Sequence, residues 1–273
     1  MIQNIHYPPK WWRTVLRYFY LIQGFKTWGR FLAWKSGLGA YDQLTMKTRK
    51  GLLINIPASL RFPFKDIFLH RAYAPRFLLK QIPANPIVID LGANAGFFSL
   101  FAFHVRPMAR CFSFEPMPEN FTLLQNHQRQ QEHLSWRIFN QAVSSKGGTA
   151  RLVCPEKSGP ATTASLVSTD SESGQRTIEV IVRPLQEILA QETGGSCDWL
   201  KIDVEGSEYD ILYSLPQETY RRIRTLAVES DPVDDDKRNR NALADFLEKM
   251  NFDVFLADDA VFYGINRSFS PND

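Results

Sequence analysis

The chain has 273 residues, of which 44% are hydrophobic, and this length suffices for one large α/β domain with an appendage. Its formal net charge of +3 is mildly basic and does not by itself indicate nucleic acid, so no such partner is predicted. Cys111, Cys154 and Cys197 form no C-x-x-C pair, which argues against a disulfide scaffold or zinc site and favours a reducing, cytoplasmic location. No uncharged apolar run reaches the roughly 18 residues of a transmembrane helix, and Arg13 and Arg17 interrupt any signal-peptide core.

Residues 1–43 form a basic, aromatic segment that we expect to be a helical appendage. Between Lys10 and Tyr41 there is no Asp or Glu. One face of a helix here would carry Trp12, Val15, Leu16, Phe19 and Ile22. The first interpretation is a lid that packs its aromatic face on the catalytic domain. The alternative is peripheral contact of residues 10–35 with the inner face of a membrane, because basic helices with Trp and Phe lie at such interfaces.

Residues 44–83 are predicted to form an approach segment that caps the site. Two short strands, over residues 43–48 and 52–56, precede a strand or turn at residues 64–73. A helix then ends before Pro83. We expect this segment to lie across the ligand-binding loop described next.

The strongest local pattern is a strand, a glycine turn and a helix within residues 87–100. Apolar, β-branched residues lead to Asp90, then Gly92, Asn94 and Gly96 alternate, and apolar residues follow at helical spacing. In open α/β sheets such a turn, at the carboxyl end of a strand, presents backbone N–H groups to a ligand. Asp90, Gly92, Asn94 and Gly96 are therefore predicted to bind a cofactor.

The charge of this loop favours S-adenosylmethionine (SAM) over NAD. The dinucleotide fingerprint G-x-G-x-x-G has a third glycine that the pattern D-x-G-x-N-x-G lacks, and Asp90 would repel a pyrophosphate. SAM carries a sulfonium and an ammonium and no phosphate. A turn without a ligand is the other alternative, because glycine-rich turns are common.

The next strand, over residues 109–115, ends in a second carboxylate. Glu115 lies 25 positions after Asp90. A carboxylate about 20 residues beyond the glycine loop can accept hydrogen bonds from both ribose hydroxyls. We therefore predict that Glu115 binds the ribose of the cofactor, the alternative being a solvated strand end.

The third strand and its exit, residues 136–143, are predicted to lie near the adenine. Asn140 and Gln141 are candidates to meet its amino group, although either could instead only cap the turn. Gln141 and Ala142 are included among the predicted cofactor-binding residues. Residues 155–175 are rich in Ser, Thr and Gly and are predicted to form a loop near the mouth of the site.

The second chemical focus is residues 199–208, a buried strand followed by Asp203 and Glu205. Alternate positions of an extended strand share one face, so both carboxylates could point into the site. Two close carboxylates shift one another's pKa, which suits general acid–base chemistry or a role in substrate binding. They could also hold a divalent cation, or Asp203 could only pair with the SAM ammonium while Glu205 caps the next helix. We predict Asp203 and Glu205 as catalytic and assign no metal ligand.

The last part of the chain is predicted to close the sheet. Residues 223–229 read as a parallel strand that ends in Glu229. Residues 252–257 and 261–265 alternate in polarity and are typical of a closing antiparallel hairpin.

Together these residues resemble the FkbM type of class I SAM-dependent methyltransferases, over roughly residues 44–266. The motifs that carry the resemblance are V-I-D-L-G-A-N-A-G at 88–96, F-E-P and E-N within 114–120, N-Q-A-V at 140–143 and K-I-D-V-E-G-S-E at 201–208. The resemblance implies a Rossmann-like α/β sandwich with a mostly parallel, seven-stranded sheet and an antiparallel last strand, in a SAM-binding domain over residues 84–267. It also implies methyl transfer to a hydroxyl oxygen of a sugar, glycan or other small-molecule acceptor.

In this interpretation Asp203 lies between the methionine part of the cofactor and the acceptor, and Glu205 is the base. SAM would be held by Asp90, Gly92, Asn94, Gly96 and Glu115. Two competing classes are an NAD-dependent oxidoreductase and a non-catalytic, membrane-associated binding module. The loop charge disfavours the first, and the second gives the Asp203–Glu205 pair no purpose. The sequence leaves the acceptor and the oligomeric state open.

Overall fold

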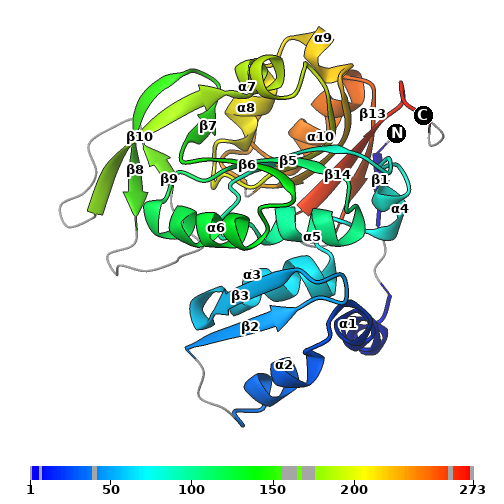
Figure 1. The fold of residues 1–273 in the computed structure, drawn as a ribbon. Helices are drawn as coiled ribbons and strands as arrows, with labels where there is room; N and C mark the ends of the chain where they lie inside the picture. Colours follow the sequence, from blue (N-terminus) through cyan, green and yellow to red (C-terminus); the bar gives the residue numbers. More distant parts are fainter. Residues whose placement is uncertain are drawn as a thin grey trace.

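The chain is built around an eight-stranded sheet with the order β1-β13-β14-β12-β11-β4-β5-β6 in a computed structural model (Figure 1). The structure describes residues 2–5, 8–38, 42–154, 165–167, 176–230, 232–257 and 261–270. Among these strands β14 alone runs antiparallel to its neighbours, as expected for the last strand. The strands of the sheet are β1 (Ile2–Asn4), β4 (Ile87–Leu91), β5 (Arg110–Phe114), β6 (Ser135–Phe139), β11 (Cys197–Ile202), β12 (Ile223–Glu229), β13 (Phe252–Leu256) and β14 (Val261–Asn266).

The count of eight strands corrects the expectation of seven. The additional strand, β1, comes from the N-terminal segment and pairs in parallel with β13, with Ile2 opposite Val254. A strand of three residues is too short to show a period of two, so the sequence pattern gave no sign of it. The Rossmann-like α/β class is confirmed.

Successive residues of the central strands alternate between two hydrophobic cores, one on each face of the sheet. Val88 and Trp199 belong to the core beneath α5 (Phe97–Val105), whereas Ile89 and Leu200 belong to the core on the other face. Figure 1 shows α5 and α6 on one face and α7, α8 and α10 on the other. The remaining helices of the sandwich are α6 (Pro118–Gln130), α7 (Leu185–Glu192), α8 (Glu208–Ser214), α9 (Gln217–Tyr220) and α10 (Arg240–Lys249).

A second, four-stranded sheet is inserted after β6, with the order β7-β10-β8-β9. Its strands are β7 (Ala142–Ser144), β8 (Gly148–Cys154), β9 (Ser165–Val167) and β10 (Arg176–Pro184). The predicted loop over residues 155–175 lies outside the described residues, apart from the backbone of β9. The insertion places Ala142 at the start of β7, close to the end of β6.

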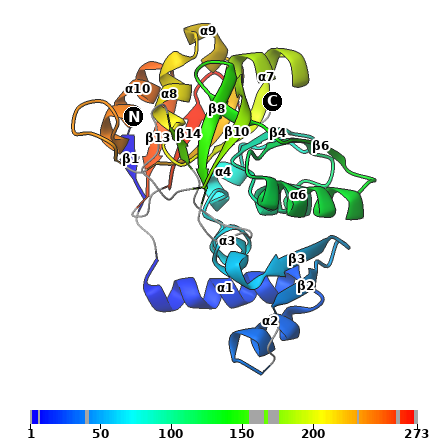
Figure 2. The same cartoon turned by 90° about the vertical axis from the view of Figure 1, so that its left-hand side faces the viewer.

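The N-terminal elements form a separate layer against α5, visible below the sheet in Figures 1 and 2, and we call this layer the cap. Residues 64–73 begin helically here, which corrects the expected strand or turn. Phe64 packs edge-to-face on Phe97, with ring centroids 5.9 Å apart, and joins the cap to α5. The elements of the cap are α1 (Lys10–Gly24), α2 (Trp28–Lys35), β2 (Gln43–Lys47), β3 (Leu53–Pro57), the short η1 (Ala58–Leu60), α3 (Arg61–Lys65) and the π-helical η2 (Asp66–His70). The next helix, α4 (Arg76–Leu79), lies outside this layer and packs its Phe77 on Phe255 of β13 and Tyr263 of β14.

Helix α1 packs with the face opposite to the one predicted, which corrects the expectation of a lid held by its aromatic face. Leu21 and Gly24 are buried, whereas the predicted packing face, apart from Leu16, is turned outward: Phe19 is 53% exposed and Val15 is 49% exposed. The aromatic stripe therefore does not bind the catalytic domain. No helix in the described part of the chain has the length and apolar character needed to cross a bilayer.

Candidate functional site

Two adjoining hollows open at the carboxyl ends of β4, β11 and β12. The larger is a cleft of about 780 Å³ between the cap and the sheet, and the smaller lies beside it, toward β5 and β7. Four of the predicted site residues line both: Gly92, Asn94, Asp203 and Glu205. The sequence motifs at residues 90–96 and 201–208 thus meet at one place, although they are more than a hundred positions apart.

The turn after β4 requires glycine at position 92. Gly92 has φ +69°, and a Cβ there would lie 1.7 Å from the carbonyl oxygen of Asp203. Gly96 also has a positive φ, +82°, but its missing Cβ faces Leu124 and Trp136 rather than either hollow. Gly92 therefore allows the two motifs to approach, whereas Gly96 allows α5 to start close to its neighbours.

Asp90 is fully buried and lines neither hollow. Trp136 Nε1 donates to Ser113 Oγ at 2.7 Å, and the Ser99 hydroxyl, 2.7 Å from Ser113 Oγ, donates to Asp90 Oδ2 at 2.8 Å. Burial raises the pKa of Asp90, and the lysine opposite it counters that rise. The carboxylate is thus held beneath the turn, as part of its support.

That lysine is Lys201, the register partner of Asp90 in the adjacent strand β11. Its ammonium lies 3.4 Å from Asp90 Oδ1 and 3.2 Å from Asp203 Oδ2, and donates to the Gly92 carbonyl at 2.6 Å. Burial disfavours the charged ammonium, but Asp203 and Asp90 outweigh it and raise the pKa of Lys201. Lys201 is therefore a buried cation that ties together the glycine turn and the end of β11.

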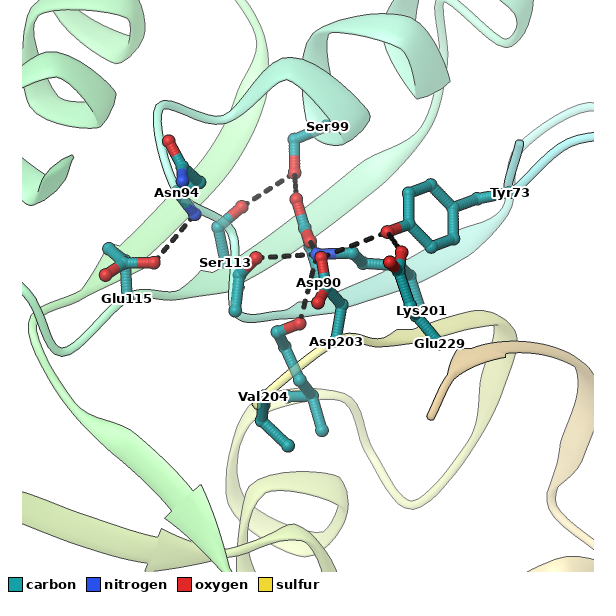
Figure 3. A network of polar contacts seen from close by, with 12 residues as sticks. Tyr73, Asp90, Asn94, Ser99, Ser113, Glu115, Lys201, Asp203, Val204 and Glu229 are labelled. Atoms are coloured by element: carbon teal, nitrogen blue, oxygen red, sulfur yellow. Dashed lines mark hydrogen bonds and ion pairs between the residues drawn. The ribbon is translucent and has the colours of Figure 1, made fainter. Parts of the chain in front are cut away.

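Tyr73 extends from the cap to the same place (Figure 3). Its hydroxyl donates to Asp203 Oδ2 at 3.0 Å and makes a short contact with Glu229 Oε2. Burial, together with these two carboxylates, raises the pKa of Tyr73 well above its usual range, so the hydroxyl stays protonated. Tyr73, Asp203 and Glu229 all line the cleft, and this contact links the cap directly to the ends of β11 and β12.

Glu115 lines the smaller hollow and holds the glycine turn at the same time. Its carboxylate accepts hydrogen bonds from the backbone N–H of Asn94, at 2.7 Å, and of Met117, at 2.9 Å. Burial raises the pKa of Glu115 to about 7, against the effect of those two donors. A ligand bound at the glycine turn would therefore also contact the Glu115 carboxylate.

The residues after β6 divide between two roles. Asn140 Nδ2 donates to the backbone carbonyls of Glu115 and Pro116, at 2.9 and 3.0 Å, which is the turn-capping alternative considered for it. Gln141 and Ala142 line the smaller hollow. The structure therefore brings these two near Glu115 and leaves the Asn140 side chain in the turn.

Asp203 and Glu205 reach the hollows through a turn rather than by strand alternation. β11 ends at Ile202, and Glu205 has φ +54°. The buried Glu208 organises this turn by accepting from the backbone N–H of Val204 and Gly206, both at 3.0 Å. Asp203 is partly buried and Glu205 is exposed, and both line the two hollows.

Four residues of this arrangement were not predicted as site residues: Tyr73, Lys201, Glu208 and Glu229. Lys201 and Glu208 lie within the motif at 201–208, so their position beside Asp203 was available as a signal. Glu229 was visible as an acid at a strand end. Tyr73 had no local signal of its role, because its partners lie 130 and 156 positions away.

The charges of the smaller hollow fit a cationic ligand without phosphate. Glu115, Asp203 and Glu205 line it, and no lysine or arginine of the described residues does. Lys201 points to Asp90, Asp203 and two backbone carbonyls instead. Within the described ranges no group of three or more His, Cys, Asp or Glu side chains is placed to hold a metal ion.

Comparison with known proteins agrees with this site. Residues 90–254 match the family described as the Methyltransferase FkbM domain. The chain belongs to the FkbM methyltransferase family. Its match begins at Asp90 and extends into β13, so it includes the glycine turn, Glu115 and the 201–208 motif. Methyl transfer is therefore its class of reaction.

Curated relatives of this FkbM methyltransferase are distant in sequence. It is 26% identical to Methyltransferase sdnD of Sordaria araneosa, over 71% of this chain and 82% of that protein. It is 27% identical to 31-O-demethyl-FK506 methyltransferase FkbM of Streptomyces tacrolimicus, over 75% of this chain and 86% of that protein. A crystal structure of Methyltransferase FkbM from Methylobacillus flagellatus KT aligns with TM-score 0.45 and 15% identity, over 74% of this chain and 52% of that chain.

Proposed function

We propose that this FkbM methyltransferase uses SAM to methylate a hydroxyl oxygen of a sugar, glycan or other small-molecule acceptor. The observation that carries the proposal is the smaller hollow, which is lined by three carboxylates and, among the described residues, by no lysine or arginine. This charge pattern suits a sulfonium and an ammonium and opposes a pyrophosphate. The name of the Streptomyces relative refers to an oxygen position of its acceptor, which supports the choice of oxygen.

The residues that would hold SAM follow from their positions. Glu115 would accept hydrogen bonds from the ribose hydroxyls, with Gln141 and Ala142 beside the adenine. Asp203 would pair with the ammonium of the methionine part. Gly92 and Asn94 would present the backbone of the turn. Asp90 and Gly96 would act through the shape of that turn rather than by contact, because neither lines a hollow.

Glu205 is the proposed general base. When bound, SAM supplies an electrophilic methyl group on a sulfonium. Glu205 would take up the proton of the acceptor hydroxyl as that oxygen accepts the methyl group, which would leave the sulfonium as a neutral thioether. Asp203 is less suited to this task because Lys201 and Tyr73 already occupy one of its carboxylate oxygens. Alignment of the reactants in the cleft would supply much of the remaining acceleration.

Calorimetry with SAM and with NADH tests the cofactor assignment. We expect saturable binding of SAM and none of NADH. A screen of sugars and lipid-linked glycans with tritium-labelled SAM then tests methyl transfer. Binding of NADH in place of SAM would support the oxidoreductase, and absence of any cofactor binding would support a binding module.

Replacement of Glu205 separates catalysis from cofactor binding. Glu205→Gln should lower kcat by roughly 100- to 10,000-fold, because a positioned base contributes about that much, and leave the Kd for SAM nearly unchanged. Asp235→Asn, in an exposed loop, is the matched control and should alter neither. If Glu205→Gln instead weakens SAM binding, Glu205 belongs to the cofactor site.

We also propose a cytoplasmic location. The three cysteines, Cys111, Cys154 and Cys197, are all free thiols and all buried. Paired cysteines would be expected in an oxidising compartment. Alkylation of the unfolded chain, isolated under conditions that trap thiols, should modify all three.

A further inference from the structure

Residues 11–38 carry most of the large apolar and aromatic side chains that are exposed in the described chain. Eight of the twelve large apolar or aromatic side chains that are exposed in the described residues lie between positions 11 and 38. These eight are Trp11, Trp12, Val15, Tyr18, Phe19, Ile22, Trp28 and Leu38. A helix of a soluble protein normally turns its apolar stripe toward the core. Here the stripe is unpartnered, and we call it the outer stripe.

The two sides of α1 have different surroundings. At about 100° per residue, the six members of the outer stripe on α1 fall within an arc of about 120°. Arg13, Leu16, Arg17 and Tyr20 fall on the opposite side, and all four line the cleft. In Figure 2 α1 runs along the margin of the molecule below α3. One side of the helix thus forms a wall of the cleft, and the other carries the outer stripe.

The charged residues of the segment that carries the outer stripe, residues 10–41, all have one sign. Residues 10–41 contain no Asp or Glu, and Lys10, Lys26, Arg30 and Lys35 are exposed. The Lys35 ammonium donates to the Tyr18 hydroxyl at 2.9 Å, which places this cation at the border of the stripe. Exposed Trp and Phe surrounded by cations match the composition of helices that lie in the headgroup region of a bilayer.

We propose that α1 and the start of α2 seat this protein on an anionic lipid surface. The outer stripe would enter the boundary between headgroups and acyl chains, and the four exposed cations would contact acidic headgroups. A second copy of the chain fits less well, because an isologous contact would bring the same basic segment against itself. An anionic bilayer supplies the opposite charge along the whole helix.

Binding of α1 to a lipid surface has a consequence for the acceptor. This consequence rests on the proposed methyltransferase function. Because α1 is one wall of the cleft, a bilayer on its outer side lies next to the cleft. An acceptor carried on a lipid could then reach the methyl donor without leaving the membrane surface. The class of substrate that fits is a membrane-anchored molecule with a free hydroxyl, such as a lipid-linked glycan.

The test is co-sedimentation of the full chain with two kinds of vesicle, phosphatidylcholine alone and phosphatidylcholine with phosphatidylglycerol. We expect binding to the second, weakened by salt because exposed charges are screened. Trp11→Ser with Phe19→Ser should lower that binding by at least about tenfold. Lys10→Gln, Lys26→Gln and Arg30→Gln should each lower it by about fivefold.

Met108→Ser with Ile181→Ser is the matched control, because these side chains are 67% and 54% exposed outside the cap. It should bind vesicles as the natural chain does. Thermal unfolding and SAM binding in solution should be unchanged in every variant, so a failed membrane test leaves the cofactor assignment intact. The proposal is overturned if the natural chain ignores anionic vesicles, or if the Trp11/Phe19 variant binds them equally well. It is also overturned if sedimentation equilibrium shows a dimer that this variant abolishes.

Discussion

The two walls of the cleft are built on different principles. On the sheet wall, Lys201 pairs with Asp203 and with the buried Asp90 behind it, and a single glycine permits the approach of two loops. On the cap wall, Arg13 and Arg17 line the same cleft from a helix whose other side is exposed. Close packing therefore fixes the residues of the sheet wall. The residues of the cap wall are less constrained, so their side chains can be adapted to the acceptor on one side of α1 and to a surface on the other.

The largest expected effect follows from removing the buried cation of the sheet wall. Lys201→Met leaves Asp90 and Asp203 without their shared partner, and should lower the free energy of unfolding by about 3–5 kcal/mol. Urea denaturation measures it. Arg17→Gln on the cap wall should cost less than about 1 kcal/mol, because Arg17 forms no buried ion pair with the residues that the structure describes.

A double substitution sharpens this result. Adding Asp90→Asn to Lys201→Met removes one of the uncompensated charges and should restore part of the lost stability. If the double variant is less stable than Lys201→Met alone, the interpretation of an ion pair that supports the turn is wrong.

A smaller effect is expected at the glycine turn. Gly92→Ala would force Cβ to within 1.7 Å of the Asp203 carbonyl, so the two loops must separate. We expect a loss of about 2–4 kcal/mol in stability and loss of SAM binding. Gly37 in the cap has a similar φ, +75°, but a Cβ there would have no atom within 4 Å. Gly37→Ala should therefore lose only the stability that a non-glycine residue loses at a positive φ. Equal losses in the two variants would contradict the close approach.

The next effect concerns the cofactor alone. Glu115→Ala should weaken SAM binding by about 1–3 kcal/mol, because charge-assisted hydrogen bonds to the ribose are lost. Calorimetry on this variant and on Glu132→Ala, which removes an exposed acid near the end of α6, measures it. An unchanged Kd for Glu115→Ala would remove this residue from the cofactor site.

A further effect is a dependence on pH. Because burial raises the pKa of Glu115 to about 7 from the ordinary value of 4.5, the folded chain holds a proton that the unfolded chain releases. The stability of the natural chain, relative to Glu115→Gln, should therefore fall as pH rises from 4.5 to about 7 and level off above it. Denaturation of both chains across this range checks it, and parallel curves would contradict the assigned shift.

The parts of the molecule that the sequence predicted well are those fixed by neighbouring residues. The strand and turn at Asp90 and Gly92 have local periods, and β14 follows a visible hairpin. The residues of the 201–208 motif are adjacent, so Asp203 and Glu205 could be placed at one edge of the sheet. The meeting of this edge with Glu115 follows from the rule that parallel strands end on the same side.

The parts that could not be predicted depend on contacts between distant segments. The pairing of Lys201 with Asp90 requires the register of β11 against β4, which the two segments do not show separately. Tyr73 acquires its role only when the cap lies on the sheet. The pattern of α1 reveals an apolar stripe, but the direction in which that stripe points depends on how well the opposite side fits the cleft.

The three-residue strand β1 has a further consequence. By pairing with β13 it satisfies backbone groups that would otherwise form an open edge of the sheet. Open edges recruit strands from other molecules and so promote aggregation. A chain shortened from its first residue would lose this protection together with α1, and its self-association could be mistaken for a changed affinity for lipid. Point substitutions that leave β1 in place avoid this confusion.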